Sequence, residues 1–312
     1  MPELRVGDQQ WSVAPGSNLL DALNAAGCGV PYSCRAGSCH ACLVRCLEGE
    51  PGDERPEALS AAQRERGWRL ACQCRVDGDL RVALFDPRVD GQPARVVAAD
   101  WLGGEVLRLR LQALNGLRYQ VGQHLLLWNA DGVARPYSLA SVPGEDPWLE
   151  FHIDCRQPGA FCTPARQLAV GAELRLGELR AGALQYDPEW QDRPLWLLAA
   201  GTGLAPLWGI LREALRQGHR GPIRLLHLAR DGAGHYLADE LKERAERYPQ
   251  LQVELVTPGE LPAALASLRV QSRQTVALVC GAPGSVEEFS RRLFLAGVPR
   301  NQVYSDLFVG HA

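Results

Sequence analysis

The rhythm of hydrophobic and polar positions changes twice along the chain, and each rhythm predicts a different kind of domain. In residues 1–86, short alternating runs surround one helical segment, which predicts a small sheet packed on a helix. Residues 94–188 hold short apolar runs divided by turn residues, a pattern typical of antiparallel strands. From residue 193 to residue 312, apolar runs alternate with amphipathic stretches, as in a parallel sheet between helices. We therefore expect a multidomain protein with α+β and α/β parts.

In the first segment, residues 4–6 and 11–13 alternate like the two strands of a hairpin, with Gly7 and Asp8 in the turn. Ser17 is the expected N-cap of a helix that Gly27 ends. The buried face of that helix is predicted to hold Leu19, Leu20, Leu23 and Ala26. Further strands are predicted at residues 42–47 and 80–84.

Residues 86–93 form a predicted linker, with two prolines, a glycine and no apolar periodicity. In the middle segment, strands are predicted at residues 106–111, 123–128, 148–153 and 173–176, and a helix at 162–169. A small antiparallel β-barrel is the natural closure for this many short strands.

In the last segment, predicted strands and helices alternate. The strands are expected at residues 195–200, 223–228, 251–256 and 275–280, and the helices at 204–217, 237–248 and 285–296. This order predicts a parallel sheet covered by helices on both faces.

Composition excludes several functions. A net charge of −3 over 312 residues argues against nucleic-acid binding, which needs a basic face. No apolar run reaches the roughly 18 residues of a membrane span, so we expect a cytoplasmic protein that binds no membrane. In that compartment thiols stay reduced, and clustered cysteines among the ten of this chain indicate metal binding rather than disulfides.

Three cysteines of one short loop carry the strongest chemical signal. Cys34, Cys39 and Cys42 have the C-x4-C-x2-C spacing that, with a distant fourth cysteine, holds a plant-type [2Fe-2S] cluster. Structural zinc sites instead favour paired C-x2-C knuckles. Cys72 and Cys74 both qualify as the fourth ligand, and spacing alone does not separate them.

Two glycine-rich turns and one polar run point to nucleotide cofactors. Gly201, Thr202 and Gly203 stand between a predicted strand and a helix, where backbone N–H groups can bind a phosphate. Cys280 and Gly281 end a second strand of the same sheet, so both turns can line one crevice.

In the middle segment, the run Arg135, Pro136, Tyr137, Ser138 offers a guanidinium for a pyrophosphate, a flat ring and a hydroxyl. A second possible anion-binding helix start follows at Gly159, Ala160, Phe161 and Cys162.

These motifs, in this order, resemble those of the ferredoxin–NADP⁺ reductase superfamily. The first 86 residues resemble the β-grasp fold of plant-type ferredoxins, and the run from Leu70 to Gln73 resembles their fourth-ligand motif, which favours Cys72. The whole chain resembles the NADH-dependent reductase components of bacterial multicomponent oxygenases and the reductases of deoxysugar pathways.

The resemblance implies a [2Fe-2S] ferredoxin domain at 1–86, an FAD-binding barrel at 94–188 and an NAD(P)H-binding domain at 193–312. It implies that Arg135 holds the FAD pyrophosphate, Tyr137 packs on the isoalloxazine and Ser138 reaches its N5. The other implied cofactor-binding residues are His152, Ile153, the run Gly159, Ala160, Phe161, Cys162, and Gly201, Thr202, Gly203, Arg230 and Gly281. Ser138, Cys280 and Phe308 are the implied catalytic residues.

Three positions depart from the family pattern. Cys162 stands where the family usually has Ser or Thr, and Asp306, two residues before Phe308, stands where it often has Glu. The glycine-rich turn expected at the end of the barrel is reduced to Ala181 and Gly182.

A physical argument links the sites independently of the resemblance. Nicotinamide gives up two electrons together as hydride, whereas a [2Fe-2S] cluster accepts one at a time. A chain that holds both needs a carrier able to make both transfers, and flavin is such a cofactor. We therefore expect electron transfer from NAD(P)H through FAD and the cluster to a partner redox protein.

The partner and the preferred nucleotide are less constrained. The expected acceptor is an oxygenase component; a deoxysugar dehydratase or other radical enzyme is the alternative, and a non-catalytic redox sensor is a third. NADH is favoured over NADPH because Asp231, beside Arg230, would repel a 2′-phosphate.

Overall fold

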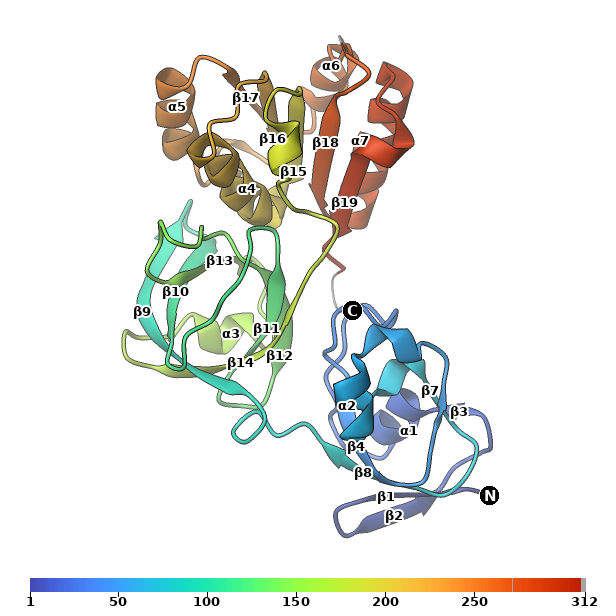
Figure 1. Ribbon diagram of the computed structural model, residues 1–312. Coiled ribbons are helices and arrows are strands. Elements are labelled where there is room, and N and C mark those ends of the chain that lie inside the picture. The colour runs from blue at the N-terminus through green and yellow to red at the C-terminus, as the bar shows by residue number, and fades with distance from the viewer. Residues whose placement is uncertain (271, 310–312) are drawn as a thin grey trace.

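The computed structural model describes residues 1–270 and 272–309 and shows three lobes in chain order (Figure 1). The N-terminal lobe contains a five-stranded and a three-stranded sheet, the middle lobe a six-stranded antiparallel sheet, and the C-terminal lobe a five-stranded parallel sheet. Sheets of these three kinds are what the sequence pattern predicts.

The N-terminal lobe begins with the predicted hairpin. Its larger sheet has the order β2-β1-β8-β4-β6, built from β1 (Glu3–Val6), β2 (Gln9–Ser12), β4 (Leu43–Glu48), β6 (Trp68–Leu70) and β8 (Leu80–Leu84). Its smaller sheet joins β3 (Ser17–Asn18), β7 (Cys74–Val76) and β5 (Gly52–Asp53). Helices α1 (Leu19–Ala25) and α2 (Ala61–Glu65) complete the lobe.

Two details of the predicted helix are wrong. Asn18, not Ser17, is the N-cap, because its side chain accepts a hydrogen bond from the Asp21 N–H, whereas Ser17 donates to the Ala14 carbonyl. Ala26 follows the last helical residue and is exposed, while Leu19, Leu20 and Leu23 form the buried face as expected.

The middle lobe is a sheet of order β12-β11-β14-β9-β10-β13. The strands are β9 (Gln92–Leu102), β10 (Val106–Ala113), β11 (His124–Trp128), β12 (Ala134–Ser138), β13 (Leu149–Asp154) and β14 (Glu173–Arg180). Its two ends approach each other where the Ala140 N–H donates to the Glu150 carbonyl at 2.8 Å. Helix α3 (Cys162–Ala165) is shorter than predicted, and β9 includes the last two residues of the predicted linker.

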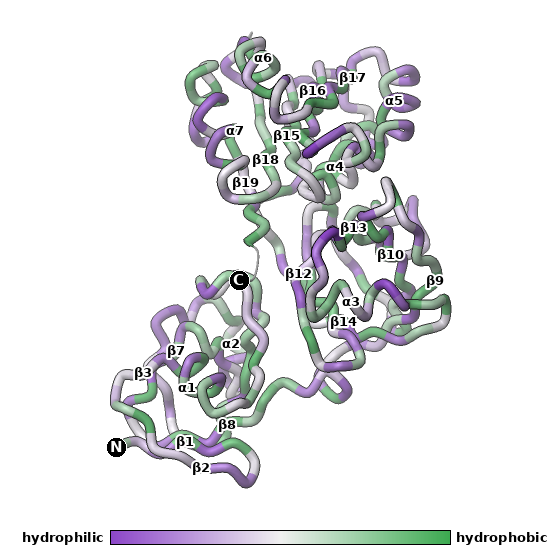
Figure 2. The backbone as a smooth tube through the Cα atoms, turned by 180° about the vertical axis from the view of Figure 1, so that it is seen from behind, coloured by the Kyte–Doolittle hydropathy of each residue, from purple (hydrophilic) through white to green (hydrophobic). Residues whose placement is uncertain are grey.

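The C-terminal lobe has the strand order β17-β16-β15-β18-β19, all parallel. The strands are β15 (Leu195–Ala200), β16 (Ile223–Leu228), β17 (Leu251–Val256), β18 (Val276–Gly281) and β19 (Val303–Leu307). The helices are α4 (Leu204–Arg216), α5 (Ala238–Arg247), α6 (Leu261–Ala266) and α7 (Pro283–Ala296). Purple, hydrophilic stretches lie on the outer helices α5 and α7 in Figure 2, as expected of helices that cover a buried sheet.

The strand order reverses between β15 and β18, which places a crevice at their carboxyl ends. The turns that follow these strands press together there. A Cβ atom on Gly203 would lie 2.3 Å from the Cys280 carbonyl oxygen, and one on Gly281 would lie 2.7 Å from the Ala200 Cβ. Only glycine fits at both positions, so the two glycines of the sequence motifs are explained by close packing.

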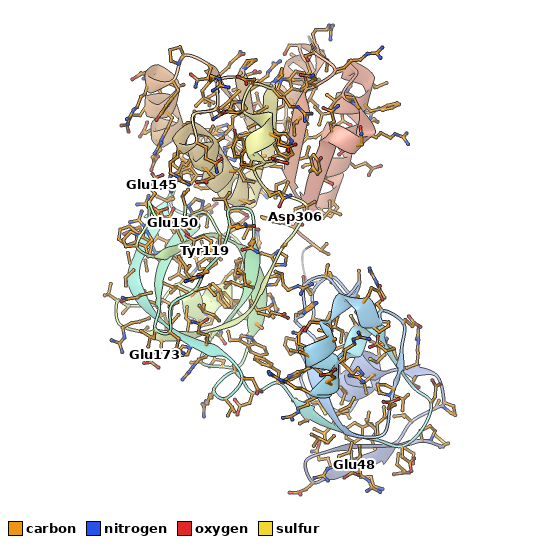
Figure 3. All side chains as sticks on the ribbon, in the orientation of Figure 1. Glu48, Tyr119, Glu145, Glu150, Glu173 and Asp306 are labelled. Carbon is orange, nitrogen blue, oxygen red and sulfur yellow. The ribbon has the colours of Figure 1, made fainter. Side chains whose placement is uncertain are left out.

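A buried guanidinium joins the middle and C-terminal lobes. Arg212 of α4 donates to both carboxylate oxygens of Asp146, at 2.8 and 2.9 Å, and to Glu145 at 2.7 Å. Its side chain is only 8% exposed, and it lies over the ring of Trp208. Figure 3 shows Glu145 and Glu150 along this seam.

Among the helices of residues 1–270 and 272–309, none has the length and apolar character needed to cross a bilayer.

We expect Arg212→Met to lower the melting temperature by about 5–10 °C, because it leaves the partly buried Asp146 carboxylate without its counter-charge at a cost of about 2–3 kcal/mol. The matched control is Arg220→Met, whose partner Asp192 is 69% exposed, and which should shift the melting temperature by less than about 2 °C. Differential scanning calorimetry measures both, and equal shifts would contradict the role given to Arg212.

Candidate functional site

The cysteine loop between α1 and β4 is a strained turn that places its thiols in pairs. Arg35 and His40 have φ angles of +50° and +55°, in the left-handed region that side chains usually avoid. Backbone N–H groups of Ala36 and Cys39 donate to the Cys34 sulfur at 3.3 and 3.4 Å. Donors aimed at a sulfur favour the thiolate, which is the form that binds metal.

The thiols form two neighbouring pairs, one of Cys34 with Cys39 and one of Cys42 with Cys72. Hydrogen bonding by Cys39 is the main cause that lowers the pKa of Cys34 to about 4. Hydrogen bonding by Cys42 is likewise the main cause that lowers the pKa of Cys72 to about 7, and the side-chain amide of Gln73 also donates to that sulfur. Within residues 1–270 and 272–309, no three His, Cys, Asp or Glu side chains gather as a site for one metal ion. Two thiol pairs at one end of a domain fit a two-iron cluster, which takes two ligands on each iron.

Cys74 lies on β7 and is fully buried in the core of the N-terminal lobe. Burial is the main cause that raises the pKa of its thiol, which disfavours the thiolate. The structure therefore supports Cys72 over Cys74 as the fourth ligand.

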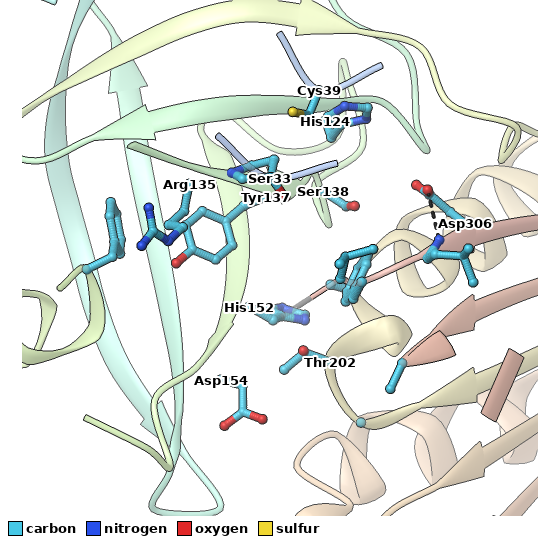
Figure 4. A pocket seen from close by; sticks show the side chains of 18 of the residues that line it. Ser33, Cys39, His124, Arg135, Tyr137, Ser138, His152, Asp154, Thr202 and Asp306 are labelled. Atoms are coloured by element: carbon cyan, nitrogen blue, oxygen red, sulfur yellow. Dashed lines mark hydrogen bonds between the residues drawn. The ribbon is translucent and has the colours of Figure 1, made fainter. Parts of the chain in front are cut away.

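A cavity of about 880 Å³ opens where all three lobes meet (Figure 4). The middle lobe contributes Arg135, Tyr137 and Ser138 from β12 and His152 from β13. The volume lies in the range of cofactor sites. The remaining predicted residues that line it are Gly159, Ala160, Phe161, Cys162, Gly201, Thr202, Arg230 and Phe308.

The N-terminal lobe closes one side of the same cavity. Ser33, Cys34, Ser38 and Cys39 line it together with the β12 residues. In Figure 4, Cys39 and Ser33 lie at one side of the cavity and Thr202 and Asp306 at others. The cysteine loop thus faces the cavity of the middle lobe directly.

Four of the predicted site residues do not line the cavity. Ile153 points into the barrel core, since side chains alternate along β13 and its neighbours His152 and Asp154 face the cavity. Cys280 is fully buried beneath the glycine turns, in the core of the C-terminal lobe. Gly203 and Gly281 form the tightly packed floor behind Gly201, Thr202 and Ala282.

Aromatic packing and hydrogen bonds hold the β12 and β13 residues in place. The rings of Tyr137 and Phe161 meet at 5.2 Å, and burial raises the pKa of Tyr137. His152 is hydrogen-bonded to Glu150 at 3.1 Å through Nε2, and Glu150 accepts from Arg110 at 2.6 Å. Although burial would raise the pKa of Glu150, these two partners lower it to about 2, so the carboxylate is ionised.

The N-terminal lobe is held against the barrel by one apolar seam and one carboxylate. Cys39 and Ala41 pack on Leu126, Trp128 and Ala134. Phe85, from the end of the N-terminal lobe, stacks on Trp128 with ring centroids 5.2 Å apart.

Glu178 of β14 completes this contact. It accepts hydrogen bonds from His40 at 2.6 Å and from the Gln63 amide at 2.9 Å. Burial alone would raise the pKa of Glu178, but His40 and Arg180 hold it below its usual value. The seam therefore sets how the cysteine loop faces the cavity.

Sequence analysis did not find His124 or assign a role to Asp306 at the cavity. Burial is the main cause that lowers the pKa of His124 and raises the pKa of Asp306. The charge of each residue partly offsets the shift in the pKa of the other. Within the described residues, His124 Nδ1 is buried without a hydrogen-bond partner. The sequence did place His124 at the start of a predicted strand, two residues after Gly122. That pattern does not tell which face of the strand lines a cavity.

Comparisons with known proteins agree with this geometry. A family model described as a 2Fe-2S iron–sulfur cluster binding domain matches residues 5–77, and one described as an oxidoreductase NAD-binding domain matches residues 197–291. The reductase subunit of an aromatic O-demethylase from Amycolatopsis sp. (strain ATCC 39116 / 75iv2) is 34% identical over 258 residues, covering 78% of this chain and 77% of that one.

The chain belongs to the iron–sulfur flavoprotein reductases. Another relative, the reductase component 1 of terephthalate 1,2-dioxygenase from Comamonas sp., is 29% identical, covering 96% of this chain and 95% of that one. Among solved structures, the ferredoxin reductase in carbazole 1,9a-dioxygenase aligns with a TM-score of 0.66 and 26% identity over 98% of each chain. The Amycolatopsis cytochrome P450 reductase GcoB aligns with a TM-score of 0.64 and 27% identity over 99% of each chain.

This reductase therefore transfers electrons from NAD(P)H, and its cofactors are FAD and a [2Fe-2S] cluster. The residues present fit both groups. The thiol pairs suit the cluster, and the large cavity with Arg135, Tyr137, Ser138 and the unpaired nitrogen of His124 suits the flavin.

We expect Cys72→Ser to abolish the visible absorption of the cluster and to lower the iron content well below the roughly two atoms per chain of the intact protein. Cys74→Ser, two residues away and facing the core, should keep both. Absorption spectra and iron analysis of the two variants decide the assignment, and the opposite pattern would give the fourth position to Cys74.

Proposed function

We propose that this reductase passes electrons from NADH, through FAD held by the middle lobe and the cluster held by the N-terminal lobe, to an oxygenase component. One observation carries the proposal: Cys34 and Cys39 line the same cavity as Tyr137 and Ser138. FAD supplies the conversion between a two-electron hydride donor and a one-electron acceptor. No further carrier is needed between sites that share one cavity. We propose residues 1–86, 94–188 and 193–312 as the three domains.

Each side of the cavity has a proposed task. The Arg135 guanidinium, at the wall of the cavity, is the proposed pyrophosphate ligand, because two parallel N–H groups match two phosphate oxygens. Tyr137 offers a ring face, fixed by Phe161, for the isoalloxazine. The hydroxyl of Ser138 is the proposed hydrogen-bonding group for N5.

The helix start after β13 is a further proposed contact. Gly159, Ala160, Phe161 and Cys162 all line the cavity. The Cys162 thiol points to the Asp154 carbonyl at 3.3 Å, so it is not the donor that a Ser would be. The neighbouring Thr163 hydroxyl accepts from the Gly159 N–H at 3.2 Å and holds this turn together.

The four cluster ligands proposed are Cys34, Cys39, Cys42 and Cys72. The pairing of the thiols supports Cys34 and Cys39 as the ligands that would hold one iron, and Cys42 and Cys72 as those that would hold the other. Cys34 is the most exposed of these four cysteines, and it lines the larger cavity.

The proposed site for the hydride donor is the crevice between β15 and β18. A second cavity, of about 420 Å³, continues from Gly201 and Thr202 along Arg230, Asp231 and Gly234. The first cavity reaches the same two turn residues, so a dinucleotide laid across them would extend from one cavity into the other. Phe308 lines the first cavity, and its backbone N–H donates to the Gly281 carbonyl at 2.8 Å. We therefore propose that Phe308 covers the crevice between β15 and β18.

An oxygenase component is the proposed acceptor because relatives that span nearly the whole chain are named as reductase components of dioxygenase and monooxygenase systems. The fold and cofactors serve other one-electron acceptors equally well, so this choice rests on the relatives. It is tested by combining the reductase with an oxygenase component encoded beside it and measuring product formation that depends on NADH.

We expect a variant without the cluster, Cys42→Ser, to retain NADH oxidation with ferricyanide while losing at least about nine-tenths of cytochrome c reduction, because only the second acceptor depends on the cluster route. FAD content measured on the same sample is the control. If both activities fell together at normal FAD content, the proposed order of carriers would be wrong.

We expect NADH to be preferred over NADPH by at least about tenfold in kcat/KM, equivalent to about 1.4 kcal/mol. Asp231 is fixed in the second cavity because its carboxylate accepts from the Gly234 N–H at 3.1 Å, and it would repel a 2′-phosphate. Steady-state kinetics with both nucleotides measure the ratio, and Asp231→Asn should reduce it. A tenfold preference for NADPH would overturn the assignment.

A further inference from the structure

Two histidines lie beneath the phosphate turn without lining either cavity. His227 stands on β16 among leucines and is 0% exposed. Its Nε2 is 3.0 Å from the Gly201 carbonyl oxygen. His235 follows the turn Gly232–Gly234, and its Nδ1 is 3.3 Å from Nδ1 of His227. A fully buried imidazole between two leucines is costly unless its hydrogen bonds are made.

The direction of both hydrogen bonds follows from chemistry. Burial, aided by the nearby His235, lowers the pKa of His227 to about 4, so the ring is neutral at working pH. A carbonyl oxygen only accepts, so Nε2 of His227 carries the hydrogen and its Nδ1 is bare. Nδ1 of His235 must therefore donate, and it keeps that hydrogen whether or not its Nε2 is protonated.

The bond from His227 orients one peptide of the turn. Gly201, with φ of +56°, directs its carbonyl inward, where the Leu204 N–H also donates to it. In a planar trans peptide, the next N–H points opposite to that carbonyl. The N–H of Thr202 is therefore directed outward, on the side where Gly201 and Thr202 line both cavities.

We propose that His227 is a positioning residue for the diphosphate of the nicotinamide dinucleotide, and that His235 locks its tautomer. This inference rests on the proposed function. With its carbonyl anchored from behind, the turn presents a fixed N–H to a phosphate oxygen at a helix start. Without the bond from His227, only the Leu204 N–H holds that carbonyl, and the orientation of the Thr202 N–H is less fixed.

A second set of contacts ties this pair to the flavin cavity. The ring of Tyr236 meets His227 edge to face at 5.8 Å. Its hydroxyl is 3.2 Å from Nδ1 of His152, which lines the larger cavity. The support for the phosphate turn and the wall of the flavin cavity are thus parts of one packed network.

The test compares His227→Gln with His227→Asn in the full-length reductase loaded with both cofactors. The amide nitrogen of Gln reaches the place of Nε2 and can donate to Gly201, whereas that of Asn is one methylene too short. We expect Asn to raise the KM for NADH, and the Kd of ADP-ribose measured by calorimetry, by about tenfold, the effect of one lost hydrogen bond. Gln should keep both constants within about threefold, and kcat with ferricyanide at saturating NADH should stay within about threefold in both variants.

A merely structural role predicts another result: both variants melt at lower temperature and bind ADP-ribose normally, which would overturn the proposal. Equal losses of ADP-ribose binding in Gln and Asn would also overturn it. If His227→Asn does not fold, His235→Phe tests the same bond, because it frees His227 to place its hydrogen on Nδ1 and should raise the Kd several-fold. A wild-type protein that neither oxidises NADH nor binds ADP-ribose would show that the proposed function itself is wrong.

Discussion

The contact between the cysteine loop and the barrel is the interaction on which the placement of the N-terminal lobe against the other two depends. Two electron-transfer groups work together only when they are held close, and here the holding is done by the loop itself. Cys39 and Ala41, inside the ligand motif, pack against Leu126, Trp128 and Ala134. The residues proposed to surround the cluster are therefore also the residues that dock the N-terminal lobe.

This double use explains the strain in the loop. His40 adopts φ of +55° between two proposed ligands, and its side chain is directed to Glu178 of the barrel. A left-handed conformation in a residue with a side chain persists only when its surroundings stabilise it. The carboxylate of Glu178 and the apolar seam provide that stabilisation, so the loop conformation and the domain contact support each other.

The middle and C-terminal lobes are joined differently, by hydrogen-bonded charged and polar side chains that are mostly buried. Arg212 binds Glu145 and Asp146, and the chain of Arg110, Glu150, His152 and Tyr236 crosses the same seam. Networks of this kind resist rearrangement because breaking one member leaves another buried and unpaired. The crevice between the larger cavity and the Gly201–Gly203 turn is therefore held by a connected set of buried contacts.

Local pattern was enough to predict most elements and motifs. The strands from β15 to β18, the hairpin of β1 and β2, the cysteine spacing and the glycine turns are encoded by residues that are close in the chain. Such features depend on periodicity, turn chemistry and ligand spacing, which are readable without a fold. The errors at Ser17 and Ala26 lie at helix ends, where one residue decides the cap.

Tertiary structure decided which of these residues meet. Only the fold separates His152, which lines the cavity, from Ile153, which fills the barrel core, and shows Cys280 buried behind the turns. Only the fold brings Glu178 to His40, which lies 138 residues away along the chain. Only the fold also brings His124 beside Asp306 and His227 to the Gly201 carbonyl. The sequence by itself determined the cofactors and their order, because each motif is local. The shared cavity and its supports are long-range contacts between lobes, and such contacts have no local pattern.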